Sequence, residues 1–165
     1  MQPVTAEPAS IAQEKEDLMK VISQQHLFSV LSALRKDKKI VFTNGVFDVI
    51  HKGHIYYLQK AKKLGDILIL GLNTDASVKR IKGNDRPLNN EYDRAYVLNA
   101  LYCIDYIVLF AEDTPIELIK TIQPDILVKG ADYTIENVIG WEFAKETVLI
   151  DFQAGYSSTN IINQL

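Results

Sequence analysis

The sequence has little of several features that point to particular classes of protein. Its 165 residues include a single cysteine, Cys103, which excludes an internal disulfide, and no apolar run approaches the roughly 20 residues that span a bilayer. Residues 1–10 lack both the basic start and the apolar core of a secretory signal. The net charge is −3, and no long basic stripe indicates a nucleic-acid partner. We therefore expect a cytoplasmic protein that binds neither nucleic acid nor membrane and has a small anionic ligand.

The sequence does contain enough apolar residues for one core, since 47% of the chain is hydrophobic. Apolar residues at helical spacing over residues 10–36, with Ser10 as a candidate N-cap, predict one long helix. We expect this helix to form an N-terminal extension, residues 1–38, ahead of a single domain at residues 39–165. Its sequence suits a packing or dimerisation element.

Beyond residue 39, short apolar segments alternate with amphipathic ones. Strands are predicted at residues 40–43, 66–72, 106–110, 125–129 and 147–152, and helices at residues 53–65, 91–101, 115–122 and 138–145. Thr114 with Glu117 predicts a capping box for the third of these helices. This alternation predicts an α/β fold: a doubly wound, Rossmann-like parallel sheet of about five strands in the order 3-2-1-4-5, with an extra N-terminal helix.

In such a sheet the ligand crevice lies at the carboxyl ends of the first and fourth strands, where the side to which successive strands are added reverses. Residues 43–54 follow the first strand there and read Thr-Asn-Gly-Val-Phe-Asp-Val-Ile-His-Lys-Gly-His. Gly45 lets the backbone come close to a ligand, and the helix N-terminus that follows offers N–H groups to a phosphate. The spacing of His51 and His54 puts both imidazoles on one side, where they can stabilise charge during phosphoryl transfer.

The longer string Phe-Thr-Asn-Gly-x-Phe-Asp-x-x-His-x-Gly-His resembles the H-x-G-H signature of the nucleotidyltransferase superfamily, which includes the cytidylyltransferases. Residues 73–80, 129–133 and 155–159 also resemble the adenylyltransferase part of the bacterial ADP-heptose synthases. The resemblance runs from about residue 39 to the end of the chain. It implies transfer of AMP from ATP to D-glycero-β-D-manno-heptose 1-phosphate, for lipopolysaccharide core synthesis. It also implies a homodimer and a separate sugar kinase acting upstream.

The chain departs from the superfamily pattern at two positions. Many members carry an arginine in or after a C-terminal Ser-Thr motif, whereas the last arginine here is Arg94. A different cation must then contact the triphosphate, and we expect the long loop at residues 82–90 to close over the phosphates. Val46 stands where the heptose enzymes often have cysteine.

These considerations assign roles to the following residues. The expected catalytic residues are His51, His54, Lys82 and Arg86. The expected nucleotide-binding residues are Thr43, Asn44, Gly45, Val46, Phe47, Gly53, His54, Lys129, Gly130, Asp132, Ser157, Ser158 and Thr159. The expected substrate-binding residues are Asp48, Asn73, Asp75, Lys79 and Arg94. ATP is a substrate, Mg²⁺ is carried by the triphosphate oxygens and water, and no metal site on the protein is expected.

Several of these residues have simpler interpretations. The histidine pair is a possible metal site, although zinc needs a third or fourth ligand. Cys103 fits a small core residue, and Lys129 a solvated strand end. Asp132 and residues 157–159 fit caps of a turn and a helix.

Two other functions remain open. One is a cytidylyltransferase acting on glycerol 3-phosphate or a similar phosphorylated alcohol, on the same scaffold. The other is a non-catalytic nucleotide-binding module, because a doubly wound sheet does not guarantee activity.

Overall fold

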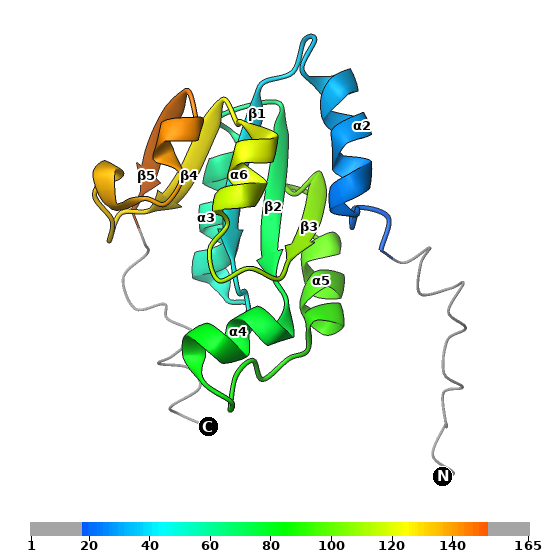
Figure 1. Cartoon of the computed structure of the whole chain (residues 1–165), viewed down its shortest axis with the longest axis vertical. Coiled ribbons are helices and arrows are strands. Elements are labelled where there is room, and N and C mark those ends of the chain that lie inside the picture. Colours follow the sequence, from blue (N-terminus) through cyan, green and yellow to red (C-terminus); the bar gives the residue numbers. More distant parts are fainter. Residues whose placement is uncertain (1–17, 152–165) are drawn as a thin grey trace.

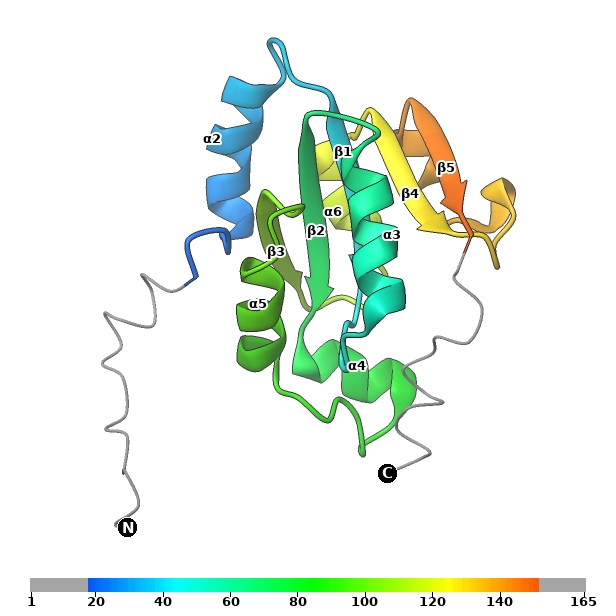
Figure 2. The same cartoon turned by 180° about the vertical axis from the view of Figure 1, so that it is seen from behind.

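A five-stranded parallel sheet between two layers of helices makes up the computed structural model, which describes residues 18–151 (Figures 1 and 2). The strands are β1 (Ile40–Gly45), β2 (Ile67–Asn73), β3 (Tyr106–Phe110), β4 (Ile126–Gly130) and β5 (Glu146–Ile150). The helices are α2 (Gln24–Leu34), α3 (Lys52–Lys62), α4 (Asp75–Lys82), α5 (Glu91–Asn99) and α6 (Ile116–Ile122), with two 3₁₀ turns, η1 (Ile135–Asn137) and η2 (Trp141–Phe143).

The strand order is β3-β2-β1-β4-β5, and neighbouring strands are parallel throughout. This confirms the predicted fold class and order. The side of the sheet to which successive strands are added reverses between β1 and β4, which pair at Val41 with Ile126 and at Phe42 with Leu127. The carboxyl ends of these two strands therefore meet at one edge of the sheet, and α4 crosses below that edge (Figure 1).

Both faces of the sheet are buried, as parallel sheets require. Ile40 and Phe42 of β1 pack in a cluster that includes Leu27 of α2 and residues of α6. Val41 points to the other face and packs with residues of α3 and α5. Figure 1 shows α6 in front of the sheet, and Figure 2 shows α3 from the opposite side. The segment before β1 therefore contributes to the core, and the division at residue 38 stays a prediction.

The predicted single helix over residues 10–36 is wrong in the part that the structure describes. Residues 20–22 run beside β3 instead, where the Ile22 amide donates to the Ile107 carbonyl at 2.9 Å and the Ile107 amide donates to the Lys20 carbonyl at 2.8 Å. Helix α2 begins only after Ser23, whose side chain accepts from a backbone amide. The edge of β3 satisfies backbone groups that a helix would otherwise pair. Ser10 lies outside the described residues.

Three further predictions differ from the structure. Pro115, and not Thr114, is the N-cap of α6, and no side chain caps this helix, so the predicted capping box is wrong. In place of the helix predicted at residues 138–145 the structure has only the short turn η2, and η1 precedes it. Helix α4 was not predicted, although Thr74 caps it by accepting from the Ser77 amide at 3.3 Å. No helix in residues 18–151 is long and apolar enough to cross a membrane.

Candidate active site

The loop between β1 and α3 makes a tight turn around Phe47. Phe47 adopts a positive φ of 49°, which is unusual for a residue with a side chain and costs on the order of 1–2 kcal/mol. Its ring is buried and packs over Gly45, where an added Cβ would lie 2.8 Å from the ring. Gly45 therefore makes room for Phe47, a role that the sequence did not reveal.

The two histidines form a reciprocal cap at the start of α3. Nδ1 of His51 accepts from the Gly53 amide at 3.1 Å, and Nδ1 of His54 accepts from the His51 amide at 3.4 Å. Their ring centroids are 3.9 Å apart. Because each Nδ1 acts as an acceptor, the proton of each neutral imidazole is assigned to Nε2. Each ring therefore carries an Nε2–H donor beside an N-terminus that already attracts anions.

Both histidines are held in the neutral form. Burial lowers the pKa of His51, and burial together with the nearby charges of His51 and Lys82 lowers the pKa of His54 to about 4. The effect of Lys82 also shows that the end of α4 lies near this pair. At neutral pH the imidazoles are therefore hydrogen-bond donors without a charge, and Lys82 is the cation beside them.

Lys129 lies at the end of β4, across from the end of β1. Its Nζ donates to Oδ1 of Asn44 at 2.5 Å. Burial lowers the pKa of Lys129 to about 8, and the charge of Asp132 partly offsets this effect. Lys129 is thus partly buried and hydrogen-bonded, which does not fit its simpler interpretation as a solvated strand end. Lys129 remains mostly protonated at pH 7, and its ammonium group, in a site of low dielectric, favours an anionic ligand.

Thr43 and Tyr57 connect β1, α3 and β4 beneath the site. Their hydroxyl oxygens form a hydrogen bond of 2.8 Å, in which either can be the donor, and both lie within hydrogen-bond distance of the carbonyl of Val128, at 3.1 Å from Thr43 and 3.0 Å from Tyr57. Both side chains are buried, and burial raises the pKa of Tyr57. The Thr43 side chain is thus engaged with the protein, and a nucleotide contact through its backbone stays a prediction. Tyr57 was not predicted, because its role depends on a carbonyl far away in the sequence.

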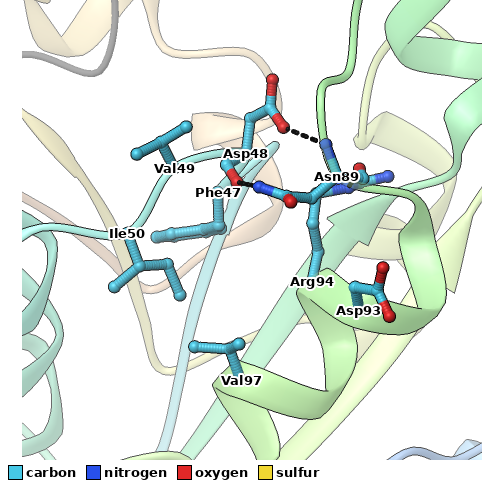
Figure 3. Close-up of a pocket in the computed structure, with 8 residues that line it drawn as sticks. All are labelled: Phe47, Asp48, Val49, Ile50, Asn89, Asp93, Arg94 and Val97. Atoms are coloured by element: carbon cyan, nitrogen blue, oxygen red, sulfur yellow. Dashed lines mark hydrogen bonds between the residues drawn. The ribbon is translucent and has the colours of Figure 1, made fainter. Parts of the chain in front are cut away.

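Asp48 anchors the connection between α4 and α5 (Figure 3). Its carboxylate accepts from the amides of Leu88 and Asn89, both at 2.9 Å, and from Nη1 of Arg86 at 3.2 Å. In return, Nδ2 of Asn89 donates to the Asp48 carbonyl at 2.6 Å. The Asp48 carboxylate therefore positions this loop, and its expected contact with substrate stays a prediction.

Arg94 donates hydrogen bonds to three segments of the site: the β1–α3 loop, the loop before α5 and the start of α4. Its Nε, Nη1 and Nη2 donate to the carbonyls of Asn89 and Val46 and to Oδ1 of Asp75, at 3.0, 2.7 and 2.7 Å. The side chain of Arg94 is 0% exposed, against 30% for that of Asp75. Each of the three guanidinium nitrogens donates a hydrogen bond within the protein, so Arg94 supports the site, and its direct contact with substrate stays a prediction.

The remaining expected residues are placed as follows. Asn73 is buried and donates to Oγ of Ser77 at 3.0 Å. Lys79 lies in the last turn of α4, and Gly53 and Gly130 lie in α3 and at the end of β4. Residues 157–159 lie outside the described residues. Within residues 18–151, no group of three His, Cys, Asp or Glu side chains could hold a metal.

A cavity of about 240 Å³ opens beside the β1–α3 loop (Figure 3). The residues that line it are Phe47, Asp48, Val49, Ile50, Asn89, Asp93, Arg94 and Val97. Its walls come from this loop, from Asn89 and from α5. Of these residues the sequence predicted Phe47, Asp48 and Arg94, whereas nothing local marks Asn89, Asp93 or Val97 as neighbours of residue 48.

The chain is similar to known proteins over its whole length. The family model described as cytidylyltransferase-like matches residues 42–164. The bifunctional protein HldE of Helicobacter hepaticus is 53% identical over 165 residues, covering 100% of this chain and 34% of that protein. The bifunctional protein HldE of Helicobacter pylori is 58% identical over 146 residues, covering 88% of this chain and 31% of that protein. The chain thus spans about a third of the length of these curated relatives.

Solved structures agree with the fold. The lipopolysaccharide core biosynthesis protein from Thermoplasma volcanium is 30% identical, with a TM-score of 0.56 over 73% of this chain and 99% of that chain. The pantoate-beta-alanine ligase from Francisella tularensis has a TM-score of 0.65 at 17% identity, over 86% of this chain and 72% of that chain. The second likeness supports the architecture alone.

Proposed function

This chain belongs to the cytidylyltransferase-like family and is a nucleotidyltransferase, and from that premise we propose that it transfers AMP from ATP to a sugar 1-phosphate. The acceptor that we propose is D-glycero-β-D-manno-heptose 1-phosphate, so that the products are ADP-heptose and pyrophosphate. The strings at residues 73–80, 129–133 and 155–159 support this choice, because they resemble the ADP-heptose synthases. So does the likeness to a protein named for lipopolysaccharide core biosynthesis.

The observation that carries the proposal is the geometry of the histidine pair. In the reaction, an oxygen of the sugar phosphate attacks the α-phosphorus of ATP, a new P–O bond forms, and the bond to the departing pyrophosphate breaks. The attacking oxygen is already anionic at neutral pH, so no general base is needed. What is needed is stabilisation of charge on the phosphates. The Nε2–H groups of His51 and His54 supply donors for that purpose, because Nδ1 of each ring is engaged with the backbone.

Other residues of the site fit the binding of two anions. Lys129, held by Asn44, is a candidate for contact with the nucleotide phosphates. Lys82 lies near His54, and Arg86 is oriented by Asp48, so both are candidates for the pyrophosphate or the sugar phosphate. Mg²⁺ supplies further charge neutralisation when it arrives with the triphosphate, held mainly by phosphate oxygens and water.

Three wider expectations stay predictions. They are a sugar kinase that acts upstream, a homodimeric state and a location in the cytoplasm. The curated relatives are named bifunctional and extend well beyond the part that this chain matches.

The test is pyrophosphate release with the purified protein, Mg²⁺ and either ATP or CTP. We expect turnover with ATP and D-glycero-β-D-manno-heptose 1-phosphate, little with CTP, and little with glycerol 3-phosphate as the acceptor. Preference for CTP would assign the chain to a cytidylyltransferase instead. Binding of ATP without product from either acceptor would favour the non-catalytic nucleotide-binding module.

A further inference from the structure

The cavity of about 240 Å³ lies over a different part of the sheet from Lys129. One wall is α5, whose buried residues pack with those of β2 and β3, whereas Lys129 ends β4 on the other side of β1. The other wall, residues 47–50, leads directly into His51. The Phe47 ring forms part of the cavity, and its centroid is 5.2 Å from that of the His54 ring. The cavity is therefore adjacent to the histidine pair, but away from Lys129, the candidate contact with the nucleotide phosphates.

The lining of the cavity combines hydroxyl-binding groups with apolar surface. Asp93 accepts from the Asn90 side chain with Oδ2 and has further lone pairs on its carboxylate. Asn89 uses one side-chain N–H on the Asp48 carbonyl, which leaves its amide capacity for another donor and acceptor. Val49, Ile50 and Val97 provide apolar contacts. A polyhydroxylated carbon chain presents the same mixture of hydroxyl and C–H groups.

Charge sets the orientation of such a ligand. The Asp93 carboxylate repels a phosphate but accepts hydrogen bonds from hydroxyl groups. Arg86, at 3.2 Å from the Asp48 carboxylate, is a cation on the loop that borders the cavity. A sugar phosphate in the cavity would therefore place its hydroxyls near Asp93 and its phosphate toward Arg86 and the histidines. That is the direction that attack on the α-phosphorus requires.

Resting on the proposed function, we propose that this cavity is the acceptor subsite, which binds the hydroxylated carbon skeleton of the sugar phosphate. Part of this subsite is preorganised, because the lining residues Asp48 and Arg94 are held by hydrogen bonds to the surrounding loops. Asn89, Asp93 and Val97 are then specificity-determining residues for the acceptor. None of them belongs to the β1–α3 string from which the nucleotide site was recognised.

The test is to fill the cavity with Val97→Trp. Val97 is 48% exposed, so the larger side chain can be accommodated without disturbing the core. We expect the KM for the sugar phosphate to rise at least about tenfold, while the KM for ATP changes less than about twofold. The matched control is Tyr96→Trp, because Tyr96 is 47% exposed on the same helix and does not line the cavity. Both acceptor and ATP constants should stay near wild type in the control.

Equilibrium titration of D-glycero-β-D-manno-heptose 1-phosphate against the three proteins gives a readout that does not need catalysis. Binding to wild type and Tyr96→Trp, but weaker binding to Val97→Trp, supports the subsite even where turnover fails. Absence of turnover with retained binding would count against the proposed function alone. Equal binding by all three proteins, or binding by none, would overturn the subsite. An equal rise in the KM for ATP would also overturn the subsite, because it would assign the cavity to the nucleotide. A changed association state with unchanged acceptor binding would overturn it as well, because it would assign the cavity to an interface.

Discussion

The site has two halves that hold their charged groups in different ways. In the strand-end half, formed by the ends of β1 and β4 and the start of α3, burial lowers the pKa of His54 to about 4 and that of Lys129 to about 8. In the loop half, formed by residues 46–50 and 86–94, opposite charges pair directly, as in the 2.7 Å contact between Arg94 and Asp75. The loop half is therefore assembled before substrate arrives. The strand-end half gains its strongest electrostatic partner only when an anion binds.

The largest effect on activity is expected from His54→Ala. Loss of one donor to the developing charge should lower kcat by about 10²- to 10³-fold. Stability should fall by only about 1 kcal/mol, because a single backbone contact at 3.4 Å is lost. Steady-state kinetics and urea unfolding would separate the two effects. His26→Ala, in the exposed part of α2, is the control, and full turnover by a folded His54→Ala protein would contradict the role given to the pair.

The loop half should respond in the opposite way, with a loss of stability. Arg94→Met leaves the Asp75 carboxylate and the carbonyls of Val46 and Asn89 without their donor. We expect the free energy of unfolding to fall by about 3 kcal/mol, as for other broken buried pairs.

Arg80→Met is the matched control for Arg94→Met. Arg80 pairs with Asp113 at 2.6 Å, but the two side chains are 49% and 58% exposed. Such a pair contributes less than about 1 kcal/mol. Urea denaturation of both variants would measure the difference. Equal losses in the free energy of unfolding would show that the buried contacts of Arg94 stabilise the protein no more than an exposed ion pair does.

A smaller effect is expected for Asp48→Asn, which keeps the size of the side chain but removes its charge. The amide replaces one acceptor oxygen with a donor, so one of the contacts to Leu88, Asn89 or Arg86 must be lost. We expect the unfolding free energy to fall by about 1–2 kcal/mol. The KM for the sugar phosphate should rise while that for ATP holds. Asp113→Asn controls for the loss of a surface carboxylate, and a rise confined to the KM for ATP would place Asp48 with the nucleotide instead.

The smallest predicted effect is in the pH profile of kcat/KM for ATP. Lys129 is cationic below its pKa of about 8 and loses its charge as the pH rises through that value, so ATP should bind less well above about pH 8. His54 should produce no loss between about pH 6 and 7.5, because its pKa of about 4 keeps its ring neutral there. Lys129→Met should remove the alkaline limb, and its persistence in that variant would point to another group.

The strand order was predictable because apolar strands that alternate with helices leave few arrangements of a parallel sheet. The start of α3 was also predictable in outline, since His51 and His54 lie close in sequence. Helix α4 was missed because it is short and polar, although Thr74 before it and Gly83 after it are capping signals in the printed sequence. The N-terminal helix was predicted too long, because apolar residues that pack against a strand edge cannot be distinguished from a helical face by spacing alone.

The sequence by itself determined the fold class, the strand order and the presence of a histidine-containing turn before α3, since each depends on short-range patterns of residue type. Only the tertiary structure decided what surrounds that turn. The anchoring of residues 86–89 by Asp48 and the burial of Arg94 join segments about 40 residues apart or more. The lowered pKa of Lys129 likewise depends on how deeply the sheet buries it. Contacts and burial of this kind arise from packing, which no local pattern of residues specifies.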